Sequence, residues 1–249
     1  MSGNEASPMC ERPVATAIPI LAHYRIAPTD LVYLWEDCKR CFYDKYVHRL
    51  ERPRSFSEHF TNADRAMRRA LPAGKVIDLG VGQRFRVISQ GGWVESKPIA
   101  FPSHAVSLSF RGQYDAVVVN DSDEFVVVDY KTTTMDDGAL MKFRRQLMCY
   151  VTAIELPITF DEQMPAYVDA TALLVFDPSN FVFNGKTKRS GLYGQTRWVE
   201  LPRRNDLFDA FLQKVAAMLA DPFAPRSDDK CGICLIRQGR IITNIRSVL

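Results

Sequence analysis

The sequence predicts an α/β fold in which a mixed central β-sheet is flanked by helices. Short β-type runs broken by Gly, Ser and Pro fill residues 75–128, between segments with helical periodicity. Within this region, residues 116–119 and 125–128 are nearly continuous apolar runs, which are typical of strands buried on both faces of a sheet. Helical and strand patterns alternate after it, as expected where helices cover a sheet.

The composition is that of an ordinary globular protein. With 249 residues, 47% of them hydrophobic and 24% charged, the chain is long enough for one large domain or two small ones. No apolar run approaches the roughly 20 residues that cross a bilayer, and the N-terminus lacks the pattern of a secretory signal. We therefore expect a cytoplasmic protein with no membrane partner. The net charge of +3 does not by itself indicate a nucleic-acid partner, although basic clusters occur at residues 65–69 and 142–145.

The first helices are predicted from apolar spacing. Residues 1–29 show no sustained period and are expected to form a tail or an extended arm. A helix is predicted to begin after Asp30, which can act as its N-cap. Its apolar positions follow the three-and-four spacing of one helical face and are Leu31, Leu34, Trp35, Cys38 and Phe42. A second helix is predicted over residues 62–71, before Pro72.

The clearest element is a β-hairpin. Residues 120–124, between the two apolar runs, are turn formers. If the turn is centred on Ser122, Val119 faces Phe125 across the hairpin. Counting back four residues on each strand then places Asp115 opposite Asp129.

The later elements follow from periodicity. We expect a helix, a strand, a polar loop rich in Gly and Lys, a second strand and a last helix, with the four regular elements at residues 139–154, 171–176, 197–201 and 206–220. The last helix is expected to end at Asp221-Pro222. The predicted organisation is a tail at residues 1–29, one domain at residues 30–237 with cysteine pairs at both ends, and a C-terminal tail at residues 238–249.

The predicted hairpin brings two acids and a lysine together. Two carboxylates that face each other in a buried sheet repel, unless a cation lies between them. Lys131 lies two residues after Asp129 and projects from the same strand face. Carboxylate oxygens suit Mg²⁺ or Mn²⁺, and a lysine beside such an ion can orient a nucleophile or stabilise charge during phosphodiester hydrolysis. Taken alone, one D-x-K is also compatible with an ordinary strand end.

Three segments resemble one nuclease family in both order and spacing. They are GQYD at residues 112–115, VVDYKT at residues 127–132 and QLMCY at residues 146–150. They resemble the G-x-x-D, D-x-K-T and Q-x-x-x-Y series of RecB-like nucleases, a branch of the PD-(D/E)XK superfamily. The resemblance implies a restriction-endonuclease-like core for the mixed sheet and its helices.

The resemblance also implies roles for individual residues. Asp115 and Asp129 would bind the catalytic metal, Tyr130 would lend its backbone carbonyl to it, and Lys131 would be the catalytic lysine. The family usually presents a further His or acid on a helix before the sheet, often within G-x-x-H, and this chain has no such match. Asp64 is the nearest substitute as a metal ligand and His59 the next, so the number of metal ions stays open.

Gln146 and Tyr150 complete the implied catalytic set. They are four residues apart and share one helix face, from which the family's Gln and Tyr help to position DNA. The resemblance implies a metal-dependent DNA nuclease, with exonuclease action expected and DNA that is single-stranded or has a free end as substrate. A helicase, or a repair or adaptation protein, is an expected partner. The chain has no helicase motif, so an unwinding partner would be a separate protein.

Two C-x-x-C units predict a second metal site. They supply Cys38, Cys41, Cys231 and Cys234, about 190 residues apart. Four thiolates are the right number for zinc or an iron-sulfur cluster, and a cytosolic chain argues against disulfides. The pairs resemble the cluster-bearing RecB-like nucleases, including CRISPR-associated adaptation exonucleases and AddB-type enzymes. That resemblance implies a 4Fe-4S cluster, with Zn²⁺ as the alternative.

The cysteine pattern departs from those relatives in one respect. They typically take one cysteine from the N-terminal segment and three from the C-terminal one, whereas this chain divides them two and two. The two remaining cysteines lack partners at ligand spacing. Cys10 is expected in the tail, and Cys149 in a helix core.

Two other functions remain open. Residues 76–82, VIDLGVG, resemble the methyl-donor loop of class I S-adenosylmethionine-dependent methyltransferases, which would make Asp78 a binding residue. However, Arg84 replaces the third glycine, and residues 85–95 have a β-type pattern where that fold requires a helix. The second alternative is a catalytically inactive module that keeps the nuclease fold to bind nucleic acid.

Overall fold

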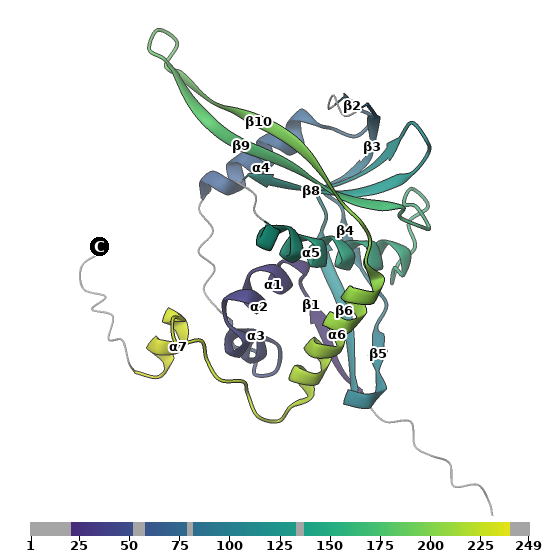
Figure 1. The fold of residues 1–249 in the computed structure, drawn as a ribbon, viewed down its shortest axis with the longest axis vertical. Helices are drawn as coiled ribbons and strands as arrows, with labels where there is room; N and C mark the ends of the chain where they lie inside the picture. Colours follow the sequence, from purple (N-terminus) through teal and green to yellow (C-terminus); the bar gives the residue numbers. More distant parts are fainter. Residues whose placement is uncertain (1–20, 52–57, 79–81, 133–136, 240–249) are drawn as a thin grey trace, which may run out of the picture.

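The structure is a computed structural model that describes residues 21–51, 58–78, 82–132 and 137–239. Two β-sheets and the helices around them make up the described part of the chain (Figure 1). Helices cover both faces of the larger sheet. The predicted α/β fold with a mixed, helix-flanked sheet is therefore confirmed.

The larger sheet carries the predicted hairpin. Its strand order is β10-β9-β8-β7-β3-β2, with β8 and β9 parallel and every other neighbouring pair antiparallel. Its strands are β2 (Val76–Asp78), β3 (Arg84–Gln90), β7 (Ala116–Asn120), β8 (Phe125–Thr132), β9 (Ala170–Asn184) and β10 (Arg189–Leu201). Parallel pairing of β8 with β9 requires a long crossover, and a helix provides it.

The smaller sheet is built around one strand. The strand β6 (Val106–Gln113) pairs in parallel with β1 (Ala22–Ile26) and antiparallel with β4 (Trp93–Glu95) and β5 (Ile99–Phe101). The chain passes from β6 directly into β7, so the two sheets meet at residues 114–115. The last residues of the expected N-terminal arm thus form a sheet strand, because β6 offers them a free edge.

The predicted first helix is wrong in its continuity. It is divided into α1 (Pro28–Val32), α2 (Leu34–Asp37) and α3 (Lys39–Tyr46). The backbone of Cys38 is extended, with φ −165° and ψ 112°, and it ends one helix and begins the next. Asp30 is not an N-cap but lies inside α1, where its carboxylate accepts hydrogen bonds from Lys45 (2.6 Å) and Tyr46 (2.7 Å).

The other predicted helices lie within a few residues of their expected positions. They are α4 (Glu58–Ala70), α5 (Asp137–Glu155) and α6 (Asn205–Ala220). The short helix α7 (Gly232–Arg237) follows α6, and the 3-10 turn η1 (Pro102–His104) lies between β5 and β6. The helix α6 ends before Asp221, whose backbone is extended, as the Asp-Pro pair predicts. Among the described residues, no helix is long and apolar enough to cross a membrane.

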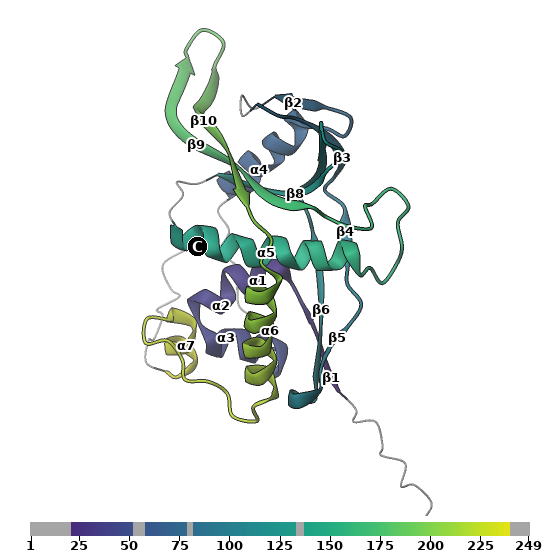
Figure 2. The same ribbon diagram turned by 45° about the vertical axis from the view of Figure 1, so that its right-hand side comes forward.

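Alternating valines in β7 and β8 divide the large sheet into two packed faces. Val117 and Val127 belong to one apolar cluster with residues of α5. Val118 and Val126 face the opposite side, where Met67 of α4 packs against them. This period of two explains why the runs read as continuously apolar, and the predicted burial on both faces is confirmed. Figure 2 shows α5 crossing the middle of the molecule, between the large sheet and the helices α1, α2, α3 and α6.

One predicted loop is wrong. The polar segment between residues 176 and 197 forms the outer half of the long hairpin β9–β10, which projects from the molecule (Figure 1). Phe181 and Phe183 are 69% and 68% exposed there, so burial does not hold these strands together. Instead, the backbone pairing of β9 with β10 continues outward from the buried part of the sheet. The amino-acid composition of the segment does not reveal this continuation.

Candidate functional site

The hairpin register is the one that the turn length predicts. Val119 is opposite Phe125 and Ala116 is opposite Val128, so the next step brings Asp115 opposite Asp129. Both carboxylates are buried, with 5% and 2% of each residue exposed. The backbone N–H of Tyr130 donates a 2.6 Å hydrogen bond to Asp115 Oδ2, which joins the two strands beside the acids.

The two carboxylates are electrostatically strained without a cation. Burial, followed by the charge of Asp129, raises the pKa of Asp115 to about 8, although Lys131 and Arg68 act in the opposite direction. Two buried carboxylates cannot both ionise easily, and a divalent cation between them would remove the conflict. The donor set of two acids fits Mg²⁺ or Mn²⁺, which bind oxygen ligands.

Lys131 lies beside the second acid. Its Nζ contacts Asp129 Oδ2 and stands 4.7 Å from the centre of the Phe143 ring. Burial lowers the pKa of the Lys131 ammonium, but the charges of Asp129, Tyr33 and Asp115 and the contact with Asp129 together outweigh burial and hold that pKa above its usual value. The side chain therefore stays positively charged at the carboxylate pair.

The helix α5 adds a polar pair from the opposite side. Gln146 Nε2 donates hydrogen bonds to Asp129 Oδ1 (3.1 Å) and to the Tyr150 hydroxyl (3.2 Å). Among the described residues, no hydrogen-bond partner is found for the buried Gln146 Oε1. Burial, followed by the charge of Asp129, raises the pKa of Tyr150, so its hydroxyl stays protonated. The predicted sharing of one helix face by Gln146 and Tyr150 is confirmed.

Arg68 reaches the site from α4, and the sequence motifs did not identify it. Its Nη2 lies 2.5 Å from Asp115 Oδ1. The backbone carbonyl of Arg68 also accepts a 2.8 Å hydrogen bond from Gln90 of β3. The only signal in the sequence was the basic cluster at residues 65–69, which does not reveal which member turns inward.

Three predicted residues lie wholly or partly outside the described part of the chain. Asp64 and His59 belong to α4 by backbone, but their side chains lie outside the described residues, as does all of Cys10.

The methyltransferase hypothesis is contradicted near Asp78. The strand β2 pairs antiparallel with β3, with Val76 opposite Arg86, where that fold requires a helix after the glycine loop.

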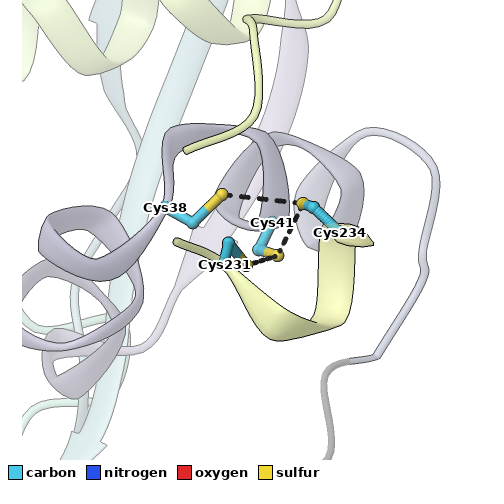
Figure 3. A group of neighbouring side chains, drawn as sticks. All are labelled: Cys38, Cys41, Cys231 and Cys234. Atoms are coloured by element: carbon cyan, nitrogen blue, oxygen red, sulfur yellow. Dashed lines mark hydrogen bonds between the residues drawn. The ribbon is translucent and has the colours of Figure 1, made fainter. Parts of the chain in front are cut away.

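The four cysteines of the C-x-x-C pairs meet at one point. Figure 3 shows their side chains directed toward one another from α3 and α7. Cys38 and Cys231 are the N-caps of these helices, and Cys41 and Cys234 lie in the first turns. The sulfur separations are 3.7 Å for Cys38–Cys234, 3.5 Å for Cys41–Cys231 and 3.5 Å for Cys41–Cys234. All four sulfur atoms lie within 4.8 Å of one another, and all four residues are buried.

The thiols differ in how readily they ionise, since hydrogen bonds outweigh burial at Cys38 and lower its pKa, whereas two others resist ionisation. Burial raises the pKa of Cys41, and it also raises the pKa of Cys234 to about 11. A metal lowers such pKa values and converts the thiols to thiolate ligands. The donor set therefore fits a metal centre. Cys149, by contrast, is buried in the cluster formed by α1–α3, α6 and the smaller sheet, as expected for a core residue.

The comparison with protein families agrees with this fold. The family model of the PD-(D/E)XK nuclease superfamily matches residues 58–238. Thirteen chains in solved structures match. One, in the crystal structure of SSO0001, is 16% identical with a TM-score of 0.42, over 80% of this chain and 78% of that one. Similarity at that level does not bear on function, and no curated protein matches. The family match spans well over half of the 249 residues, and this chain belongs to the PD-(D/E)XK nuclease superfamily.

Proposed function

We propose that this chain is a metal-dependent DNA nuclease of the RecB-like branch, acting as an exonuclease on phosphodiester bonds. One observation carries the proposal. Asp115 and Asp129 are buried opposite each other, with the ammonium of Lys131 against the second carboxylate. Such a cluster destabilises a sheet unless it binds a cation, and members of this superfamily use one to cleave nucleic acid.

The metal ligands would be the carboxylates of Asp115 and Asp129 and the backbone carbonyl of Tyr130, with Asp64 as a further ligand from α4. When bound, Mg²⁺ or Mn²⁺ would supply an activated water and offset charge on the scissile phosphate. The chain holds both carboxylates in place for this purpose. Tyr130 N–H and Arg68 bind Asp115, while Gln146 binds Asp129.

The remaining residues would act on the water and the phosphate. The Lys131 ammonium orients the attacking water or stabilises the negative charge that develops on the phosphate oxygens. Gln146 Oε1 is buried and directed to no partner among the described residues, so it can accept a hydrogen bond from a bound water. Tyr150 supports Gln146 from the next helical turn. Lys131 thus lies on the strand β8, and Gln146 and Tyr150 lie on the helix α5.

The experiment is cleavage of end-labelled single- and double-stranded DNA with Mg²⁺, Mn²⁺ or EDTA. We compare the parent chain with Lys131→Ala and with the control Lys214→Ala, since Lys214 is an exposed lysine on α6. Metal-dependent cleavage by the parent and the control, lost in Lys131→Ala, supports the nuclease. If the parent binds DNA but cleaves no substrate with any metal, the alternative of an inactive nuclease-fold module replaces it.

The same assay addresses the expected substrate and partners. Labels at the 5′ or 3′ end separate exonuclease from endonuclease products and report polarity. A higher rate on single-stranded DNA, or on duplexes with unpaired ends, supports the expected substrate. It also implies a separate helicase, or a repair or adaptation protein, that exposes such ends. Equal rates on closed duplexes contradict exonuclease action.

We propose that the cysteine site holds a single Zn²⁺ ion rather than a 4Fe-4S cluster, the other candidate that the sequence raises. Around a tetrahedral ion with Zn–S bonds of about 2.3 Å, sulfurs lie about 3.8 Å apart. A cluster of four irons would hold its cysteine sulfurs roughly 6 Å apart. Three of the six sulfur separations are 3.5–3.7 Å and all six are within 4.8 Å, which is closer to the spacing around one zinc ion.

Elemental analysis of the purified protein distinguishes the two centres. About one zinc per chain and no visible absorption are expected. Iron and sulfide in equal amounts, with a brown colour after anaerobic purification, would establish the cluster instead.

A further inference from the structure

A basic pocket with an exposed tryptophan lies on the smaller sheet. The pocket has a volume of about 330 Å³ and is lined by the cationic side chains of Arg25, Lys45, Arg49 and Arg111, with Glu51 as the one acid among its lining residues and Trp93 at its edge. Trp93 is 66% exposed, which is unusual for the largest apolar side chain. None of these residues takes part in the carboxylate site.

Trp93 and Arg111 form a cation–π pair. The Arg111 guanidinium lies 5.3 Å from the centre of the Trp93 ring. Arg111 and Arg25 also contact Glu95, at 3.3 Å and 3.7 Å, which orients both cations while leaving about half of each side chain exposed. Exposed aromatic faces beside phosphate-binding cations are the elements that bind single-stranded nucleic acid without sequence preference.

A continuous row of residues connects this pocket with the carboxylates. Trp93 is opposite Gln113 in the sheet, and Gln113 Nε2 donates a 2.6 Å hydrogen bond to the Gly91 carbonyl. A Cβ atom on Gly91 would lie 3.4 Å from Arg68 Nη1 and 3.7 Å from Gln113 Nε2, so both side chains border this glycine. Arg68 in turn binds Asp115.

The spacing along this row suits a nucleic-acid strand. Arg111 and Asp115 are four residues apart, a span of about 13 Å along an extended backbone. A few nucleotides cover that distance, at a rise of ~3.4 Å or more each. Gly91 has no side chain to obstruct the row, and its φ of +66° favours glycine there.

We propose that Trp93 and the basic pocket beside it form a subsite for single-stranded nucleic acid, from which the strand runs past Gln113 and Gly91 to the carboxylate pair. A base stacks on the exposed face of Trp93, and the arginines of the pocket bind the neighbouring phosphates. The inference rests on the proposed nuclease function for its direction, but the binding itself is independent of cleavage.

The test measures binding of a fluorescent oligothymidylate in Ca²⁺, with Asp129→Asn as the background so that no strand is cut. In this background, Trp93→Leu should weaken binding about tenfold, the effect of losing one base–aromatic stack. Trp93→Phe should restore most of the affinity, because a ring is retained. The control Phe223→Leu changes an aromatic residue that is 81% exposed near α6, and it should leave binding unchanged.

Tryptophan fluorescence supplies a second readout. Of the three tryptophans, Trp35 is 7% exposed and Trp198 packs against Phe85, so quenching by the oligonucleotide should come from Trp93 and disappear in Trp93→Phe. Unchanged affinity in Trp93→Leu, or quenching that survives in Trp93→Phe, overturns the subsite even if the chain cleaves DNA. Binding loss in Trp93→Leu with an inert parent keeps the subsite and removes the nuclease.

Discussion

The carboxylate site contains two buried aspartates and the cysteine site contains four buried thiols, and the two sites differ in what surrounds them. The carboxylates are 14 residues apart and meet within one hairpin, where Arg68, Lys131 and Gln146 bind them. The cysteines come from α3 and α7, at opposite ends of the described chain. Within the described part of the chain, their sulfurs lie against one another, at 3.5–3.7 Å in three pairs.

Because of this difference, we expect the loss of metal to have different consequences at the two sites. Arg68 and Lys131 offset part of the charge of the two carboxylates, so the fold should tolerate the loss of the metal there. At the cysteine site a metal would hold the thiolates together, and it would join α3 to α7, about 190 residues apart. Loss of metal should therefore abolish activity at the first site and lower stability at the second.

The largest expected effect is on cleavage. Asp129→Asn removes one carboxylate ligand and the partner of Lys131, and should lower the cleavage rate at least ~10³-fold. The amide keeps the shape of the side chain and relieves the repulsion of Asp115, but it leaves the Lys131 ammonium without its partner, so a partial loss of stability without unfolding is expected. Single-turnover cleavage and thermal melting of the same preparation measure both. An unfolded variant, or one that cleaves at the parent rate, breaks the proposed contrast.

The next effect is on folding. Cys231→Ser removes one metal ligand and should destabilise the fold by about 2–5 kcal/mol, within the range for loss of a metal or disulfide link between distant segments. Urea unfolding followed by elemental analysis measures the loss of stability and of zinc together. Cys149→Ala is the matched control, since that buried thiol is not one of the four neighbouring sulfurs and its variant should retain the metal. Full metal content in Cys231→Ser would contradict the assignment.

A smaller effect is expected from the residue that supports Asp129. Gln146→Leu removes the 3.1 Å hydrogen bond to that carboxylate and should lower activity about 10- to 100-fold, as changes behind a metal ligand generally do. Raising the Mn²⁺ concentration should recover part of the loss if metal affinity is affected. Tyr150→Phe should cost less, because Tyr150 reaches the acid only through Gln146. Equal losses in the two variants would show that Gln146 does not act through Asp129.

The last prediction concerns the pH dependence of stability without metal. The folded-state pKa of Asp115, about 8, lies above the ordinary carboxyl value of 3.8, so the folded state binds a proton more tightly than the unfolded state. The stability from this group is present below about pH 4 and is lost as the pH rises through about 8.

Asp115→Asn cannot ionise, so it should be more stable than the parent at pH 9, by an amount on the order of several kcal/mol, and similar in stability to the parent at pH 4. Urea unfolding without added Mg²⁺ or Mn²⁺ checks this, with Asp209→Asn on α6 as an exposed control. A parent and Asp115→Asn variant with parallel pH profiles would contradict the buried charge conflict.

Local patterns carried the prediction where the chain's neighbours in sequence are also its neighbours in space. The five-residue turn sets the hairpin register, and the alternation of valines sets its two faces. The helical spacing of Gln146 and Tyr150 likewise predicts one shared face. Periodicity did not predict the break at Cys38, because its extended backbone is tied to packing against α7 rather than to its own neighbours.

By itself, the sequence determined the mixed helix-flanked sheet, the opposition of Asp115 and Asp129 with Lys131 beside them, and two cysteine pairs with metal-ligand spacing. These depend on turn length, side-chain period and helical repeat, all of which act over a few residues. The tertiary structure alone decided that Arg68 turns to Asp115, that β1 joins the smaller sheet, and that four sulfurs lie within 4.8 Å. Such contacts join residues tens to nearly two hundred positions apart, and packing of the whole chain rather than local pattern selects them.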